Sequence, residues 1–381
     1  MKTFIKKHVP FLVMTSLLLL MIIFLIVLAI LKKNPSIAEG WTRSFGRGYT
    51  AFFEMANETV PFSVTEVSFI VSILSCVVFL AWGFCLIGLK HYWAAIHRFL
   101  MVALVITGAL TMYSASVGMA YTRKALPIER YEGEVKKEDV KDIATYFVND
   151  MNACADKLEF DENGEVKMPY STQTLLYKLR DEFRRLPDNG YYGKYIPKAK
   201  ELQTSGIFTS FGIVGVYFGV LGEANYNNYA TNAELPFYIT HELAHGAGVM
   251  REDDAQLVAT YLCLTSEDYY LRYSCYYNTI DRILNLVTYS DDENAYNDVR
   301  KQINDKCWKN FTYIYNHWKG KTFMADLGDK INDWYLKSFG QKGGTSSYND
   351  NDPSEDPVTQ KIYLSHYQSI YVKQYYDLLN K

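Results

Sequence analysis

The chain has 381 residues, of which 49% are hydrophobic and 21% are charged, and its formal net charge is −3. That length allows more than one structural unit. The near-neutral balance argues against nucleic acid as a partner, because nucleic-acid-binding proteins usually carry a basic patch.

Three stretches in the first third of the chain lack charged residues. They run over about residues 9–31, 67–89 and 99–122. A hydrocarbon core of roughly 30 Å needs about 20 apolar residues in helical form, and a helix satisfies its backbone polar groups internally. We therefore predict a membrane anchor over residues 1–122 with three transmembrane helices, followed by a water-soluble domain over 123–381.

The first span has an alternative interpretation as a signal peptide, because Lys6 and Lys7 precede it. Its apolar run is longer than the usual h-region and no clear small-x-small cleavage site follows, which favours an uncleaved anchor. Basic residues flank the spans on both sides, so the positive-inside rule does not fix the orientation. A cytoplasmic N-terminus, suggested by the likeness of the first span to an insertion signal, places the soluble domain of this multi-pass cell-membrane protein outside the cytoplasm.

The soluble part is predicted to be mainly helical with a small sheet, an α+β fold. Apolar residues three or four apart predict helices over 136–158 and 171–186. The segment 212–227 is rich in Val, Tyr, Phe and Gly and lacks a helical stripe, so it predicts one or two strands. The remaining expected elements are a loop over 32–66, helices over about 236–246, 252–266, 276–288, 297–318 and 324–338, an acidic loop over 340–357, and a final tyrosine-rich helix.

The pentapeptide HELAH, His241 to His245, carries the chemistry that the sequence predicts. Pro236 starts a helix at its first turn, on which the two histidines lie four residues apart and face one metal ion. Glu242 lies beside the first histidine, within reach of a water molecule on that ion. This is the H-E-x-x-H arrangement of zinc metalloproteases.

A catalytic zinc ion needs a third protein ligand and an open position for water. Two glycines after the motif let the chain turn back, and Glu252 then begins a second helix from which its carboxylate can complete a His, His, Glu set. Asp253 and Asp254 are alternatives for this ligand. Gln256, on the same helical face as Glu252, can accept a hydrogen bond from a ligand histidine.

Three segments carry a resemblance to a known family: GEANYN (222–227), LPFYITHELAHGAGVMREDDAQ (235–256) and NDWYLKSFGQKGGTSSY (332–348). They resemble a bacterial membrane family described as domain of unknown function 3810, which is similar to zincin metallopeptidases. The resemblance implies a zincin-like fold in which His241, His245 and Glu252 bind one zinc ion. It also implies that Glu242 is the general base.

This chain departs from the family at Asp254 and Gln256, where the family tends to Glu and Asn. A carboxylate and an amide therefore remain in similar places. Glu223 and Asn225 of the first segment are candidates for substrate contact or ligand support, with the stabilisation of a turn as the equal alternative for each. Candidate donors to an oxyanion, by residue type alone, are Tyr348, Tyr335 and His317.

The sequence therefore predicts a membrane-anchored zinc metallopeptidase that hydrolyses a peptide or protein substrate close to the lipid bilayer. Zinc lowers the pKa of its bound water towards about 7, and Glu242 takes the proton and passes it to the leaving amine. One alternative is a non-catalytic membrane sensor or peptide-binding module on a zincin-like fold. Another is a structural membrane protein without metal.

The cysteines of the soluble part do not determine the cellular compartment in which it lies. They can form two disulfides outside the cytoplasm or be reduced and buried inside it. The four residues are Cys154, Cys263, Cys275 and Cys307.

Overall fold

The computed structural model describes most of the chain, namely residues 2–349, 354–355 and 362–380. The chain divides into two compact units, namely Met1–Ala125 with Phe218–Glu223, and Leu126–Tyr217 with Ala224–Lys381. A short segment of the second half, residues 218–223, therefore belongs to the N-terminal unit. The sequence, which predicts a single boundary near residue 122, does not indicate this return of the chain.

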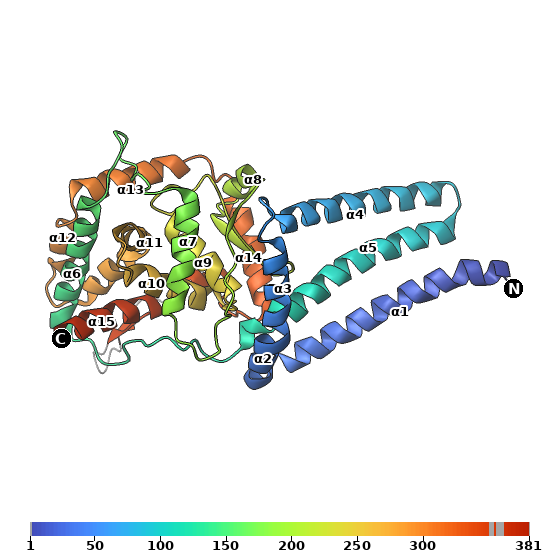
Figure 1. The fold of residues 1–381 in the computed structure, drawn as a ribbon, viewed down its shortest axis with the longest axis horizontal. Coiled ribbons are helices and arrows are strands. Elements are labelled where there is room, and N and C mark those ends of the chain that lie inside the picture. Colours follow the sequence, from blue (N-terminus) through green and yellow to red (C-terminus); the bar gives the residue numbers. More distant parts are fainter. Residues whose placement is uncertain (1, 350–353, 356–361, 381) are drawn as a thin grey trace. The chain divides into compact units, whose positions relative to one another are not determined.

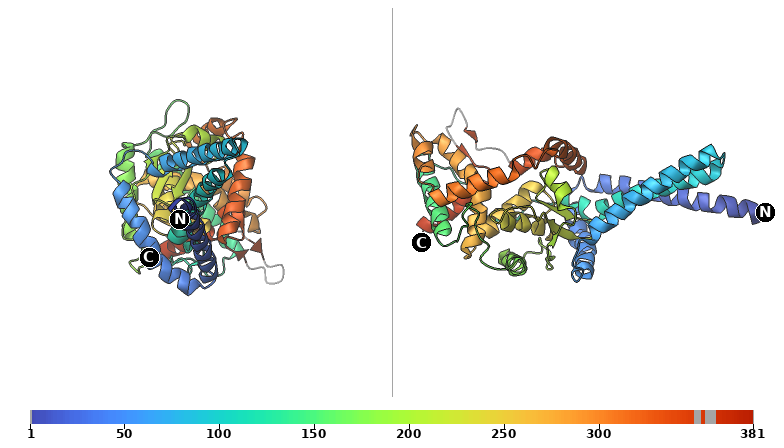
Figure 2. Two further views of the ribbon diagram at one scale, coloured as in Figure 1. Left: turned by 90° about the vertical axis from the view of Figure 1, so that its right-hand side faces the viewer. Right: turned by 90° about the horizontal axis from the view of Figure 1, so that it is seen from above.

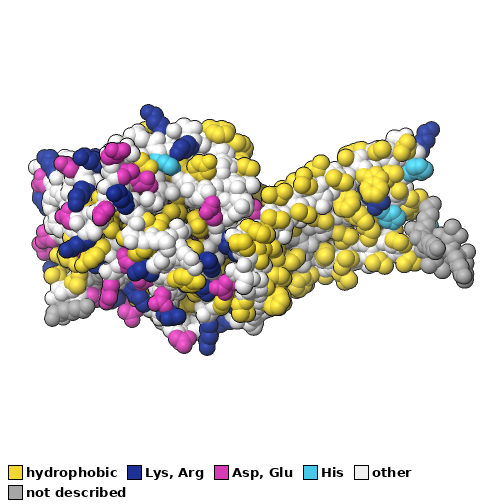
Figure 3. Space-filling view, turned by 45° about the horizontal axis from the view of Figure 1, so that its top comes forward, with side chains coloured by type: hydrophobic (Ala, Val, Ile, Leu, Met, Phe, Trp, Pro, Cys, Tyr) yellow, Lys and Arg dark blue, Asp and Glu magenta, His cyan; other side chains and the backbone are white. Residues whose placement is uncertain are grey.

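Three long apolar helices dominate the first unit (Figure 1), namely α1 (Lys2–Leu31), α4 (Val64–Gly88) and α5 (Tyr92–Tyr113). The helices α4 and α5 form a hairpin, and α1 packs against α5 (Figure 2). Among the described residues, three segments are long and apolar enough to span a membrane, namely His8–Leu31, Val64–Gly88 and Tyr92–Thr122. Most of their large side chains are exposed, and Figure 3 shows a largely apolar surface along them. These helices support the predicted association with a membrane.

The connection between the first two spans is helical, so the predicted loop over 32–66 is wrong. It contains α2 (Pro35–Trp41), a π-helical turn (Thr42–Gly46) and α3 (Arg47–Asn57). Asn34 caps α2 by accepting hydrogen bonds from two backbone N–H groups, and the indole of Trp41 donates to the carbonyl of Ala115 at 2.8 Å. Contacts with a distant part of the chain thus stabilise helices that the composition of this stretch does not predict.

Glu223, the last residue of the returning segment, caps the second span. Its carboxylate accepts hydrogen bonds from Ser63 Oγ at 3.1 Å and from the backbone N–H groups of Val64 and Thr65 at 3.2 and 2.7 Å. A carboxylate at a helix N-terminus is stabilised by the unpaired N–H groups and by the helix dipole. The structure therefore shows this buried carboxylate as the cap of α4, and the substrate contact or ligand support considered from the sequence stays a prediction.

We predict that Glu223→Ala lowers the stability of the first unit by about 1–2 kcal/mol, because three donors at the start of α4 lose their acceptor. Thermal unfolding of the full chain in detergent micelles measures the loss. Glu223→Gln, which keeps one acceptor oxygen, should lose less, and zinc content should be the same in both variants. Unchanged stability in Glu223→Ala would contradict the capping role.

The second unit is mainly helical with a small sheet. Its α-helices are α6 (Lys137–Asp156), α7 (Thr172–Glu182), α8 (Ser205–Ser210), α9 (Leu235–Gly246), α10 (Glu252–Leu264), α11 (Tyr269–Leu286), α12 (Ala295–Arg300), α13 (Asp305–Trp318), α14 (Ala325–Phe339) and α15 (His366–Leu379). Short 3-10 turns cover Phe183–Arg185, Val287–Tyr289 and Gly344–Asn349. This content confirms the predicted fold class at the level of a mainly helical protein.

The sheet contains three short strands, β1 (Lys200–Glu201), β2 (Gly215–Phe218) and β3 (Glu223–Tyr226), in the order β1-β3-β2. The strand β1 runs parallel to β3, with Lys200 opposite Asn225. Asn225 is fully buried in this central strand, whereas β2 lies at the edge of the sheet. A second, two-stranded sheet pairs β4 (Ser354–Glu355) with β5 (Ile362–Tyr363).

Two predicted elements differ from the observed ones. The single helix expected over 297–318 is observed as two helices, α12 and α13. Asn304, directly before α13, caps this helix by accepting a hydrogen bond from the N–H of Cys307 at 2.9 Å. The acidic loop expected over 340–357 begins with the 3-10 turn, and most of its remainder lies outside the described residues. All six cysteines are free thiols, and the four in this unit are buried.

The helices α9 and α10 lie in the interior of the second unit, in contact with each other and with α11 (Figure 1). A buried aromatic cluster fixes α11 on its other side. The ring of Phe147 on α6 lies 4.7 Å from that of Tyr371 on α15 and 6.4 Å from that of Tyr276 on α11. The hydroxyl of Tyr276 donates to Asp150 at 2.6 Å. Dense packing of this kind holds α9 and α10 in a rigid setting.

Candidate metal centre

The chain reverses between α9 and α10 over five residues. The first helix ends at Gly246, one residue after His245, and Gly248 then adopts a φ of 93°, a left-handed conformation that favours glycine. Arg251, in an extended conformation, precedes Glu252 at the first position of α10. This short reversal brings the start of α10 back alongside the HELAH motif.

The three predicted ligand atoms converge. Nε2 of His241 lies 3.1 Å from Nε2 of His245 and 3.1 Å from Oε2 of Glu252, and Nε2 of His245 lies 3.4 Å from the same oxygen. All three residues are buried, with exposed fractions of 4–6%. A tetrahedral zinc site with bonds of about 2.0–2.2 Å spaces its ligand atoms by roughly 3.3 Å. The donor set and its spacing therefore fit one zinc ion.

In each imidazole ring, a proton on Nδ1 leaves Nε2 free of hydrogen and able to accept. Nδ1 of His245 lies 2.7 Å from the carbonyl oxygen of Val249, which requires the proton on Nδ1. Nδ1 of His241 and Oε1 of Gln256 are buried, and neither makes a hydrogen bond among the described residues. Burial lowers the pKa of His241, and the nearby Gln256 offsets a small part of this effect. The proton on Nδ1 of His245 leaves its Nε2 atom as an acceptor, and a proton on Nδ1 of His241, near the amide oxygen of Gln256, would do the same for the other ring.

Three acceptor atoms within hydrogen-bond distance of one another require a positive charge between them. Without a metal, a proton supplies that charge. Burial lowers the pKa of His245, but the carboxylate of Glu252 raises it more, to about 9. Glu252 remains ionised, since both histidines lower its pKa against the opposing effect of burial. The cluster is therefore built to hold a cation.

Glu242 lies beside the three ligand atoms without joining them. It is 5% exposed, and burial raises its pKa to about 8, with a further contribution from Glu252. The carboxylate rests against Gly215, the first residue of the edge strand β2. A Cβ atom at that glycine would lie 2.6 Å from Oε1 of Glu242, so the absence of a side chain there leaves room for the carboxylate.

The alternative third ligands have other partners. Asp253 forms an ion pair with Arg251, and Asp254 lies 3.6 Å from the same guanidinium. Among the described residues, the group whose atoms could hold a metal ion is His241, His245 and Glu252. The structure thus brings Glu252, and not its two acidic neighbours, to the histidines.

Sequence reasoning missed one supporting residue. The backbone N–H of Glu252 donates to Oε1 of Gln341 at 3.3 Å, so this glutamine caps α10 from 89 residues away. Gln341 lies in the third segment that resembles the family, and this position is the feature of the sequence that could have identified it. In the same segment, the ring of Tyr348 lies 6.4 Å from that of His241, and its hydroxyl accepts a hydrogen bond from Asn332 at 3.2 Å.

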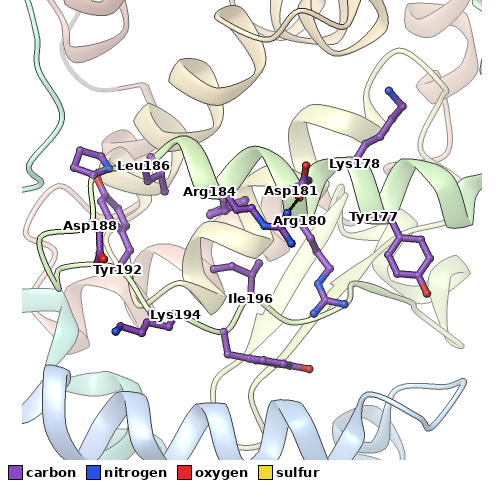
Figure 4. A pocket seen from close by; sticks show the side chains of 14 residues that line it. Tyr177, Lys178, Arg180, Asp181, Arg184, Leu186, Asp188, Tyr192, Lys194 and Ile196 are labelled. Atoms are coloured by element: carbon purple, nitrogen blue, oxygen red, sulfur yellow. Dashed lines mark ion pairs between the residues drawn. The ribbon is translucent and has the colours of Figure 1, made fainter.

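The two other candidate donors contact residues outside the cluster of predicted ligands. The ring of His317 bonds to the carbonyl of Tyr229 at 2.7 Å, and the ring of Tyr335 packs on Phe339 at 5.3 Å. A hollow of about 850 Å³ between α7 and residues 187–196 (Figure 4) is not lined by any site residue named above. Tyr348 is therefore the candidate donor that the fold brings to the centre.

A sequence comparison with protein families matches residues 41–351 to the family described as "Protein of unknown function (DUF3810)". The chain belongs to this family. No curated protein matches the DUF3810 chain, and no solved structure matches it either. The description of the family assigns no activity, so a metal and a reaction must be argued from the geometry.

We predict that purified DUF3810 protein binds one zinc ion, and that His245→Ala and Glu252→Ala lose it, since each removes one of three converging ligand atoms. Metal analysis by mass spectrometry after dialysis measures the content. Asp253→Asn is the matched control, because this neighbour of Glu252 faces Arg251 and should keep the zinc. Full zinc content in Glu252→Ala would exclude Glu252 as the third ligand.

Proposed function

We propose that this protein is a membrane-anchored zinc metallopeptidase with a zincin-like catalytic domain. The observation that carries the proposal is the convergence of His241, His245 and Glu252 with the buried carboxylate of Glu242 beside them. Two histidines, one carboxylate and an adjacent glutamate are the parts that metal-assisted hydrolysis requires. The three long apolar helices of the first unit would hold the reaction close to a lipid bilayer.

The residues of the chain have distinct roles in this mechanism. A bound zinc ion would supply an activated water molecule and polarise the substrate carbonyl. Glu242 accepts the proton of the water and delivers it to the leaving amine. Gln256 and the carbonyl of Val249 keep the ligand histidines in the required tautomer and orientation. The hydroxyl of Tyr348 would donate to the developing oxyanion, which is supported by the distance of 6.4 Å between its ring and that of His241.

The edge strand offers a binding mode for the substrate. Among the strands that the structure describes, β2 has β3 as its one neighbour, since β3 lies between it and β1. An extended peptide can add to such an edge through backbone hydrogen bonds. Because Gly215 of β2 touches Glu242, a peptide paired with this strand would pass directly over the proposed general base.

We place the catalytic domain outside the cytoplasm, as three spans and a cytoplasmic N-terminus require. Labelling of a single exposed cysteine, introduced at Tyr177, with a membrane-impermeant reagent in intact cells tests this side. Labelling that occurs only after the cells are opened would show that the domain faces the cytoplasm.

We predict that Glu242→Gln keeps its zinc and loses hydrolysis, because it removes the proton acceptor and leaves all three ligands in place. Comparing newly formed protein N-termini between native membranes with wild-type and Glu242→Gln protein measures the activity across all available substrates. Identical sets of termini in the two membranes would contradict a peptidase and favour a non-catalytic binding module.

We further predict that Gly215→Val retains zinc but lowers hydrolysis by at least about tenfold, because its Cβ displaces the carboxylate of Glu242 from its position. Val is a good strand former, so the sheet itself should tolerate it. Zinc content and the rate of cleavage of a substrate found above are measured on the same preparation. An unchanged rate would show that the contact between β2 and Glu242 has no role in catalysis.

A further inference from the structure

We propose that the pocket beside Glu242 binds a carboxylate of the substrate through Arg282, and that the protein therefore selects acidic peptides. This inference rests on the proposed peptidase function and adds to it a class of substrate. The group that binds is a carboxylate in either case, and its source is an Asp or Glu side chain or the C-terminus of a peptide.

The pocket starts at the candidate metal centre. It has a volume of about 320 Å³ and is lined by His241 and Glu242 on α9 and by Gly215 at the start of the edge strand. Its other walls come from α11, from the 3-10 turn and from α15, through Arg282, Tyr348 and Tyr367. A cavity of this size holds one side chain and the adjoining backbone of a peptide. It does not hold a folded protein segment.

Arg282 brings a positive charge into this pocket. Its side chain is 22% exposed, and the guanidinium carbon lies 5.9 Å from the centre of the Tyr367 ring. The hydroxyl of Tyr367 in turn donates to the backbone carbonyl of Tyr348 at 2.7 Å. The cation therefore lies near one of the aromatic residues that line the pocket and is partly removed from water.

The lining offers one cation to an anionic guest, namely Arg282. Among the described lining residues, Arg282 is the one Lys or Arg, and Glu242 is the one carboxylate. The acid nearest in sequence, Asp281, is 65% exposed and its oxygen lies 3.8 Å from Nε of Arg282, so this pair is screened by water. Arginine suits a carboxylate because its planar fork can donate two parallel hydrogen bonds.

The larger hollow between α7 and residues 187–196 lacks this arrangement. Figure 4 shows Arg184 directed at Asp181, with an ion-pair distance of 2.6 Å. Lys178 bonds to Asp268 at 2.9 Å. Two of the cations that line this hollow are thus held by acids of the same unit, and Glu242 is not part of its lining. Arg184, which is 84% exposed, serves instead as a matched control for Arg282.

The experiment uses full-length zinc-loaded protein in detergent with two peptide libraries from a proteome digest, one with free and one with amidated C-termini. Cleavage sites are mapped by mass spectrometry. Asp or Glu enriched at a fixed position next to the cleaved bond in both libraries identifies a side-chain carboxylate. Cleavage at a fixed distance from the C-terminus, in the free-acid library alone, identifies a terminal carboxylate.

We expect Arg282→Gln to lower kcat/KM for acidic peptides by roughly tenfold to hundredfold, the range for losing a hydrogen bond between charged groups. Neutral analogues should change by less than about twofold. The charge reversal Arg282→Glu should shift the preference to Lys or Arg at the same position, and Arg184→Gln should behave as wild type. An absent acidic preference, or one that persists in Arg282→Gln, would overturn the inference.

A binding measurement tests the carboxylate pocket independently of the proposed peptidase activity. Zinc-loaded Glu242→Gln protein is titrated with fluorescent peptides that carry Glu or Gln at one position, and anisotropy gives the Kd. A preference for the Glu peptide that disappears in the double variant Glu242→Gln, Arg282→Gln supports the carboxylate pocket even if wild type cleaves nothing. Equal affinity for both peptides would overturn it even if wild type is an active peptidase.

Discussion

The candidate metal centre of the second unit depends on three buried acceptor atoms that converge on one point. Two imidazole nitrogens and a carboxylate oxygen lie 3.1–3.4 Å apart in a region from which water is largely excluded. Such a cluster costs free energy unless a cation fills it. Two contacts support this arrangement, because the carbonyl of Val249 accepts a hydrogen bond from the ring of His245 and Gln341 caps the helix that begins with Glu252.

The first unit uses buried polar groups in a different way. Arg123 donates two hydrogen bonds of 2.8 Å to the carboxylate of Glu39, so these two charges compensate each other. Glu223 is compensated by the N-terminus of α4. Glu39 lies in α2, between the first two apolar helices, and Glu223 caps the start of α4. Backbone N–H groups at such a helix start must be satisfied before the chain enters a hydrocarbon environment.

The proposed chemistry connects three neighbouring features of the second unit. An edge strand offers backbone groups, a buried carboxylate faces its first residue, and a pocket with one arginine continues from the same point. In a peptidase, these features would align the peptide backbone, exchange the proton and select the side chain. Their proximity is a property of packing between α9, α11 and the sheet.

The sequence by itself determined the parts that depend on local spacing. Uncharged runs longer than 20 residues indicate the spans, and the interval of four residues puts His241 and His245 on one helical face. A turn of a few residues makes Glu252 a candidate ligand, although its acidic neighbours remained possible. Local periodicity did not predict the helices between residues 32 and 66.

Only the tertiary structure decided the roles that depend on distant residues. It assigned Glu223 to a helix cap more than 150 positions away, brought Gln341 to the start of α10, and placed Gly215 and Arg282 around Glu242. The physical reason is that helix geometry fixes neighbours only over three or four residues. Which side chains meet across greater separations follows from how helices and strands pack.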